Sequence, residues 1–291
     1  MKRLVRNLLH RAHGLDGRLF EPKDLLTRPR DINEAVIRRL CAPVYLGGDT
    51  ALCRVLGRYK MFVDTNDIGL SSHLMLDGYW EMWLTEVLAR TIRPGAVVAD
   101  IGANLGYFTL LMADLVGPGG HVHAFEPNPP ITTRLQKSVD VNGFAAWVTV
   151  HGEPLGQEDG RPVSIAVPEH EPKNAHVVPA CEGSGAAILA TRRLDAYPAL
   201  ADVEVIKIDV EGAEHDIWQG MGGLLARSRP LTIFMEFAAA RYADPGGFLD
   251  QIVGQGFRLG LVSLPDGALP RTRQQILDAP PNIDQMLMLE R

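Results

Sequence analysis

VVADIGANLGYFTLLMADLVGPGGHVHAFEP, residues 97–127, is the stretch that decides the fold. An apolar run ends on Asp100 and passes directly into a glycine turn, residues 101–106. An apolar helical stretch follows, then a Gly-Pro-Gly-Gly break, then a second apolar run that ends on Glu126. This order predicts a buried strand, a tight turn, a helix and a second strand, which is the repeating unit of an α/β fold.

The ends of these two strands are typical of a site for a nucleoside. Glycines at a strand-to-helix corner let the backbone approach a ligand, and the free amides of the first helical turn favour a polar or anionic group. Glu126, at the end of the second strand, can accept hydrogen bonds from both hydroxyls of a ribose. A nucleoside-bearing cofactor is therefore expected here.

The spacing of the turn decides which cofactor this is. A dinucleotide fold requires G-x-G-x-x-G, but Asn104 and Tyr107 replace two of its glycines, which argues against a nicotinamide oxidoreductase. A carboxylate at position 100 repels a pyrophosphate and attracts an ammonium or a sulfonium. The pattern D-x-G-A-N-x-G, followed by Glu-Pro, resembles the S-adenosylmethionine site of class I methyltransferases. The candidate cofactor residues are Asp100, Gly102, Asn104, Gly106 and Glu126.

Two further acids are candidates for the cofactor pocket. Glu81 stands in an aromatic cluster, residues 79–83, that opens the helix before the first strand. Glu153 follows the third expected strand, residues 147–150, in the loop that passes the adenine in the class I layout. We expect Glu81 to line the cofactor or acceptor pocket, and either Glu153 or a backbone group near Leu155 to contact the adenine amino group.

The second informative stretch is VEVIKIDVEGAEHD, residues 203–216. Its apolar part predicts a buried strand, and Asp209 and Glu211 end that strand two residues apart, on one side of it. Side chains at the carboxyl end of a central strand point into the crevice where α/β proteins bind ligands. Alternatively, the two acids are solvated turn residues that cap the next helix.

Three acids at the ends of adjacent expected strands are the candidate catalytic groups. A positioned base accelerates transfer to a hydroxyl by about 10²–10⁴-fold, and we assign this role to Glu211, with Asp209 beside it and His215 as the second choice. Carboxylates alone also suit Mg²⁺, so Asp209 and Glu236 are candidate ligands of a metal.

Strands alternate with helices along the rest of the chain. Seven strands are expected in a Rossmann-like class I methyltransferase sheet, mostly parallel, with the last strand, residues 285–289, antiparallel after a long irregular connection. Residues 1–60 are expected to form a basic N-terminal arm with a small helical cap, and residues 61–291 the methyltransferase domain.

Charge and composition limit the partners. The formal net charge is −6, with +5 on residues 1–40 and −11 on the remainder, and an acidic body argues against nucleic acid as a partner. Three cysteines without a disulfide spacing, and no apolar run of about 20 residues, predict a cytoplasmic protein. Residues 1–12 form a basic amphipathic pattern, which suits either peripheral contact with the inner face of a membrane or packing on the protein itself.

These motifs together resemble one family, the FkbM-type methyltransferases, over roughly residues 60–291. The resemblance implies an S-adenosylmethionine-dependent O-methyltransferase that acts on a hydroxyl of a sugar, a glycan or a small natural product. His215 departs from the commoner pattern, in which an apolar residue stands there. The matching stretches are VVADIGANLGYFT (97–109), HAFEP (123–127), LGQEDG (155–160), RLD (193–195) and VIKIDVEGAE (205–214).

Two other functions remain open at this point. One is a methyltransferase that acts on RNA or protein, which the acidic body disfavours for RNA. The other is a non-catalytic cofactor-binding module, although a chain that had lost its activity would be expected to lose Asp100 or Glu126 as well.

Overall fold

The computed structural model describes residues 19–168, 175–180, 187–227, 229–263 and 267–291. The predicted amphipathic helix at residues 1–12 lies outside these ranges. No helix within them has both the length and the hydropathy that a membrane crossing requires. The helices and strands are α2 (Asp24–Thr27), α3 (Arg30–Leu40), β1 (Val44–Gly47), β2 (Thr50–Val55), β3 (Tyr59–Asp64), α4 (Ser71–Leu76), α5 (Met82–Thr91), β4 (Val97–Ile101), α6 (Tyr107–Val116), β5 (His121–Phe125), α7 (Pro129–Val141), β6 (Val148–His151), β7 (Pro162–Ala166), β8 (His176–Pro179), β9 (Leu189–Ala190), β10 (Val203–Ile208), α8 (Glu214–Gln219), α9 (Gly222–Leu225), β11 (Thr232–Phe237), α10 (Pro245–Gly254), β12 (Arg258–Ser263), β13 (Gly267–Pro270), α11 (Arg273–Leu277) and β14 (Gln285–Glu290).

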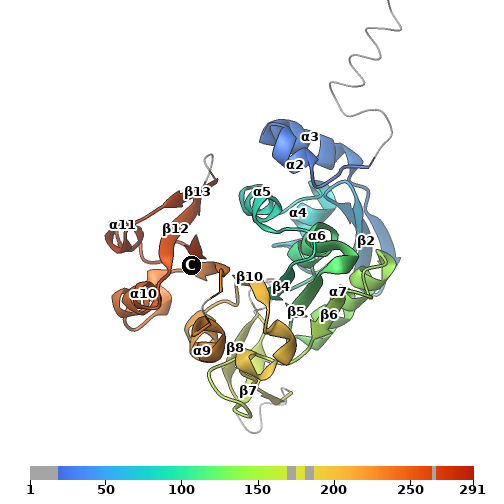
Figure 1. Ribbon diagram of the computed structural model, residues 1–291. Helices are drawn as coiled ribbons and strands as arrows, with labels where there is room; N and C mark the ends of the chain where they lie inside the picture. The colour runs from blue at the N-terminus through green and yellow to red at the C-terminus, as the bar shows by residue number, and fades with distance from the viewer. Residues whose placement is uncertain (1–18, 169–174, 181–186, 228, 264–266) are drawn as a thin grey trace, which may run out of the picture.

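An eight-stranded sheet forms the centre of the molecule, in the order β13-β12-β14-β11-β10-β4-β5-β6 (Figure 1). Strands β6, β5, β4, β10 and β11 pair in parallel, and β14 is antiparallel to both of its neighbours, β11 and β12. The predicted seven strands are all present and the antiparallel last strand is confirmed. The count of seven was one too low, because the chain after β12 turns back and adds β13 at the edge.

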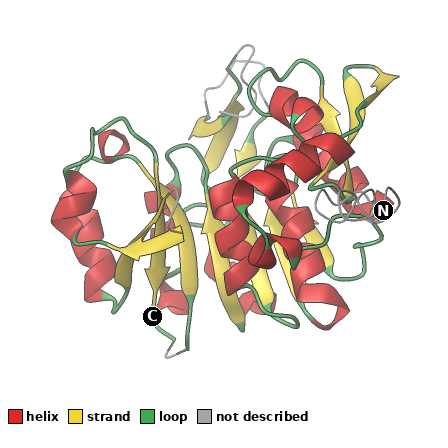
Figure 2. Ribbon diagram, turned by 90° about the horizontal axis from the view of Figure 1, so that it is seen from above, coloured by secondary structure: helices red, strands yellow, loops and turns green. Residues whose placement is uncertain are grey.

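Helices cover both faces of this sheet (Figure 2). Leu84 and Leu88 of α5 and Leu110 of α6 belong to the buried core of one face. Trp218 of α8 and Phe248 of α10 belong to the core of the other face. Because every central strand is buried on both sides, its sequence is almost continuously apolar, and a polar residue within it needs a specific partner.

The segment before the central sheet departs from the expectation of a small helical cap. It contains α2 and α3, but residues 44–64 form a separate antiparallel sheet, β1-β2-β3. The predicted division at residue 60 lies inside β3. Leu25 and Ile37 share the core cluster that contains α5 and α6, so the cap is built into the main fold (Figure 1).

Candidate active site

The glycine turn after β4, residues 101–106, which we call the glycine corner, packs against the end of β10. Gly102 has φ +76°, and a Cβ atom there would lie 1.8 Å from the carbonyl oxygen of Asp209. The backbone N–H of Asp209 in turn donates to the carbonyl of Ile101, at 3.1 Å. Gly106, at φ +97°, would bring a Cβ to 2.4 Å from Leu135. The backbone contact requires glycine at position 102, whereas at position 106 the positive φ is the main reason for glycine, since the Leu135 side chain can move.

Glu126 is held at the cavity wall by the backbone of that corner. Its Oε2 accepts from the N–H of Asn104 at 3.0 Å, and its Oε1 accepts from the N–H of Asn128 at 2.9 Å. Asn104 has φ +51°, a conformation that asparagine tolerates better than most residues. Burial raises the pKa of Glu126 to about 7, although both backbone N–H groups act in the opposite direction.

Asp100 differs from the prediction. It is fully buried and is not among the described residues that line the cavity. Its Oδ2 accepts from the hydroxyl of Thr109 at 2.6 Å, and its Oδ1 lies 3.7 Å from Nζ of Lys207. Successive strand residues point to opposite faces, so the side chain of Asp100 points under α6 and not into the turn. The predicted contact of Asp100 with the cofactor therefore finds no support in this arrangement.

Lys207 is a functional residue that the sequence reasoning missed. It lies within β10, 2% exposed, opposite Asp100 in the strand register. Its Nζ is 3.1 Å from Asp209 and 5.2 Å from the ring centroid of Phe108. Burial disfavours the ammonium, but Asp209 and Asp100 more than offset this, so the pKa of Lys207 is raised. The sequence did carry a signal for this pair: Lys207 is a single lysine in one apolar run, and Asp100 is a single acid in another.

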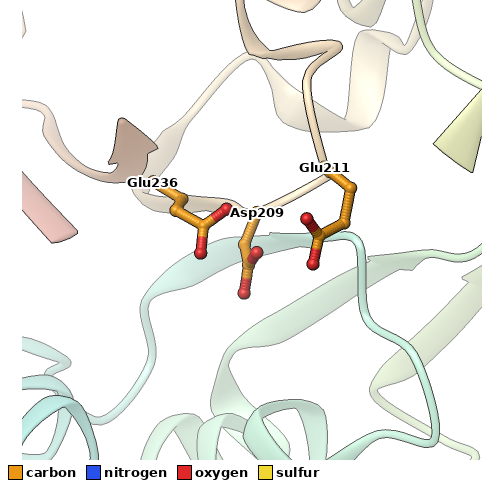
Figure 3. Close-up of side chains that lie close together, drawn as sticks. All are labelled: Asp209, Glu211 and Glu236. Atoms are coloured by element: carbon orange, nitrogen blue, oxygen red, sulfur yellow. The ribbon is translucent and has the colours of Figure 1, made fainter. Parts of the chain in front are cut away.

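Three predicted carboxylates do come together. One oxygen of each of Asp209, Glu211 and Glu236 lies within 4.8 Å of the others. Figure 3 shows the three side chains converging from the ends of two strands and the loop that follows β10. Glu211 adopts φ +56°, which turns its side chain toward the other two. The prediction that these acids share one site is consistent with this geometry.

Arg241 lies at the centre of these acids and was not predicted. Its guanidinium donates to Glu236, and it donates to Glu211 at 2.9 Å. The same group is 3.0 Å from Asp284 and 3.9 Å from the buried Glu214. Burial disfavours its charge, but Glu236 and Glu211 offset this and raise the pKa of Arg241.

The pKa values of Glu211 and Glu236 are raised in spite of the nearby Arg241. Burial raises the pKa of Glu211, against the effect of Arg241. Burial also raises the pKa of Glu236 to about 8, and the charge of Asp209 adds to this shift. Such shifts are common where carboxylates crowd together away from water.

The predicted Mg²⁺ site at Asp209 and Glu236 finds no support in this arrangement. Lys207 is paired with Asp209, and Arg241 is paired with Glu236, so each proposed metal ligand already has a protein cation beside it. The ion pairs therefore explain why these carboxylates gather.

One cavity of about 390 Å³ contains most of the predicted residues. It runs from Glu126 and Asn104 to the carboxylates around Arg241, and both Glu81 and Glu153 line it. His215 does not lie on its wall, because it is exposed in the first turn of α8 and its ring packs on Phe248. Its predicted role as the second-choice base therefore finds no support in this arrangement.

A comparison with protein families gives the identity. The model of the methyltransferase FkbM domain matches residues 100–259, which is more than half of the chain. The chain belongs to the FkbM methyltransferase family. The predicted resemblance to this family is thus confirmed.

Individual relatives match over limited segments. The 31-O-demethyl-FK506 methyltransferase FkbM of Streptomyces tacrolimicus is 60% identical over 38 residues, which cover 13% of this chain and 14% of that protein. Methyltransferase 1 of Beauveria bassiana is 26% identical over 145 residues, covering 43% of this chain and 57% of the relative. The matches therefore span less than two thirds of these relatives. Among solved structures, TYW2 of M. jannaschii in complex with AdoMet aligns with a TM-score of 0.43 and 13% identity, covering 85% of this chain and 88% of that one.

Proposed function

We propose that this FkbM-family chain transfers a methyl group from S-adenosylmethionine to a hydroxyl oxygen of a small-molecule or glycan acceptor. The observation that supports this most is the single cavity that connects Glu126 with the Asp209, Glu211 and Glu236 carboxylates. A methyltransferase must hold its cofactor and its acceptor in line, and one continuous cavity with a polar group at each end allows this.

The residues at the cofactor end fit an adenosyl group. Both oxygens of Glu126 are fixed by backbone N–H groups, so their remaining lone pairs are available to two ribose hydroxyls. Glu153 lines the same cavity and is our proposed partner of the adenine amino group. Glu81, whose charge raises the pKa of the neighbouring Lys207, is our proposed partner of the methionine ammonium. S-adenosylmethionine supplies a methyl carbon that its sulfonium already activates.

Glu211 is the proposed base. An alcohol is a poor nucleophile while its oxygen keeps the O–H proton. In the proposed step the acceptor oxygen bonds to the methyl carbon, the bond from that carbon to sulfur breaks, and Glu211 accepts the proton of the hydroxyl. Burial brings the pKa of Glu211 toward the working pH, which favours proton transfer, and Arg241 holds the carboxylate in place.

The direct test is transfer of a radioactive methyl group from S-adenosylmethionine to a panel of neutral glycosides, amino sugars and polyketide alcohols. We expect a product that has gained one methylene in mass, with its new methyl on oxygen by NMR. Label that appeared only on nitrogen, or only in protein or RNA added to the reaction, would contradict hydroxyl transfer to a small acceptor.

The role of Glu211 is tested with Glu211→Gln. We expect turnover to fall by about 10²–10⁴-fold, with the affinity for S-adenosylhomocysteine retained. Glu204→Gln, at a surface acid that pairs with Arg93, is the matched control and should turn over normally. Full turnover in Glu211→Gln would remove this residue from the mechanism.

A further inference from the structure

We propose that the acceptor half of the cavity selects by charge. The hydroxyl compound that it takes is uncharged or carries a protonated amine, and is neither a phosphate ester nor a carboxylic acid. This inference rests on the function proposed above and adds the chemical class of the acceptor.

Carboxyl groups outnumber the cations around Arg241 and Lys207. Lys207 is shared between Asp209 and the fully buried Asp100. Arg241 is shared among four acids, three of which, Glu211, Glu236 and Asp284, line the cavity and form what we call the acceptor wall. Two cations therefore serve six carboxyl groups: Asp100, Asp209, Glu211, Glu214, Glu236 and Asp284.

Among the described residues that line the cavity, Lys207 and Arg241 are the only lysine and arginine, so this described lining does not restore the balance. The lining acids are more numerous: Glu81, Glu126, Glu153, Asp209, Glu211, Glu236 and Asp284. An anionic acceptor entering this cavity meets an excess of negative charge, whereas an ammonium meets carboxylates that lack a full counterion.

The raised pKa values of Glu211 and Glu236 have the same origin. Burial and neighbouring carboxylates disfavour their charged forms. A cation bound beside them favours those charged forms again, so an ammonium on the acceptor stabilises the ionised state that the proposed base requires. An anion has the opposite effect on both groups.

Binding of cofactor analogues tests the selectivity without a known acceptor. Sinefungin places an ammonium where the transferable methyl stands, and S-adenosylhomocysteine places nothing there. Carboxy-S-adenosylmethionine places a carboxylate at that position, and S-adenosylmethionine a methyl. Calorimetric titration of the full chain with all four compounds gives two affinity ratios. The ratio of sinefungin to S-adenosylhomocysteine reports the effect of a positive charge next to the acceptor wall, and the ratio of carboxy-S-adenosylmethionine to S-adenosylmethionine reports the effect of a negative charge.

We expect sinefungin to bind about tenfold more tightly than S-adenosylhomocysteine, and carboxy-S-adenosylmethionine about tenfold more weakly than S-adenosylmethionine. Both ratios should shrink to within about threefold in Glu211→Gln or Glu236→Gln. The control Glu204→Gln should retain the wild-type ratios. Thermal unfolding and the affinity for S-adenosylhomocysteine show whether each variant is folded.

The outcomes separate this inference from the proposed function. If no adenosyl compound binds the wild-type protein, the proposed function fails. If S-adenosylmethionine and S-adenosylhomocysteine bind but both charge ratios are near one, or do not change in either glutamine variant, the proposed selectivity is overturned and the proposed function stands.

Discussion

The two halves of the cavity are built in different ways. In the cofactor half, Glu126 is held by the backbone N–H groups of Asn104 and Asn128, which belong to one strand-turn-helix-strand unit. In the acceptor half, Arg241 connects side chains from β11, from the loop after β10 and from the loop before β14, at Glu236, Glu211 and Asp284. One half depends on backbone geometry and the other on ion pairs between distant segments.

This difference predicts different sensitivities. A site made by the backbone tolerates loss of a neighbouring side chain but not a change that moves the backbone. A site made by buried ion pairs loses its arrangement when one charge is removed, because the partner charges remain buried without compensation. The following substitutions separate the two kinds of construction, from the largest expected effect to the smallest.

Gly102→Ala should have the largest effect. Its Cβ would lie 1.8 Å from the carbonyl oxygen of Asp209, and φ is +76°, so both the corner and the end of β10 must move. We expect the free energy of unfolding to fall by at least about 4–5 kcal/mol, or folding to fail. Denaturant unfolding followed by circular dichroism measures this.

Gly143→Ala is the matched control for that substitution. Gly143 has φ +77°, but a Cβ atom added there would have no neighbour within 4 Å, so only the backbone strain remains. We expect a loss of about 1–2 kcal/mol. Equal losses at both positions would show that the contact with Asp209 is unimportant.

Lys207→Met should have the next largest effect. It leaves the fully buried Asp100 without its cation, which costs about 3–5 kcal/mol of unfolding free energy. Adding Asp100→Asn in the same chain should recover part of that loss, because the uncompensated charge is then gone. A double variant no more stable than Lys207→Met would contradict the structural role that we give to Asp100.

The cofactor half should show a pH dependence through Glu126. Its pKa is raised by burial to about 7, and ribose hydroxyls donate best to the ionised form. Affinity for S-adenosylhomocysteine should therefore be nearly full at pH 8.5, about half of that at pH 7, and roughly tenfold lower than full at pH 6. Calorimetry between pH 6 and 8.5 measures this, and Glu126→Gln should make the profile flat.

Arg241→Gln should have the smallest effect on cofactor binding. The hydrogen bonds of Glu126 share no partner with Arg241 among the described contacts, so the two halves should behave independently. We expect the affinity for S-adenosylhomocysteine to stay within about threefold of wild type. A tenfold loss would show that the acceptor half also organises the cofactor half.

The same contrast explains what the sequence could predict. The pattern from Asp100 to Glu126 is local, and strand, turn and helix signals placed it correctly. The exception is Asp100, whose direction depends on strand alternation and on the cross-strand Lys207. Glu211 and Glu236 were found because each follows an apolar run that forms a strand.

Arg241 could not be found in that way. It follows β11 in a short 3₁₀ turn, residues 239–241, and only the folded chain brings it to Glu211, 30 positions earlier. The β1-β2-β3 sheet was missed because glycines and prolines divide this part of the sequence into short apolar runs, although residues 50–55 alternate between partly and fully buried positions as a half-buried strand should. Strand β13 was missed for the same reason.

The most direct test of the central claim is a calorimetric titration of the purified protein with S-adenosylmethionine and S-adenosylhomocysteine, in wild type, Glu126→Gln and the control Glu204→Gln. We predict saturable binding of both compounds to wild type and control, weakened at least about tenfold in Glu126→Gln, because a carboxylate that accepts from the ribose is lost. Equal binding by all three proteins, or no binding by wild type, would contradict the claim that this cavity holds the cofactor through Glu126.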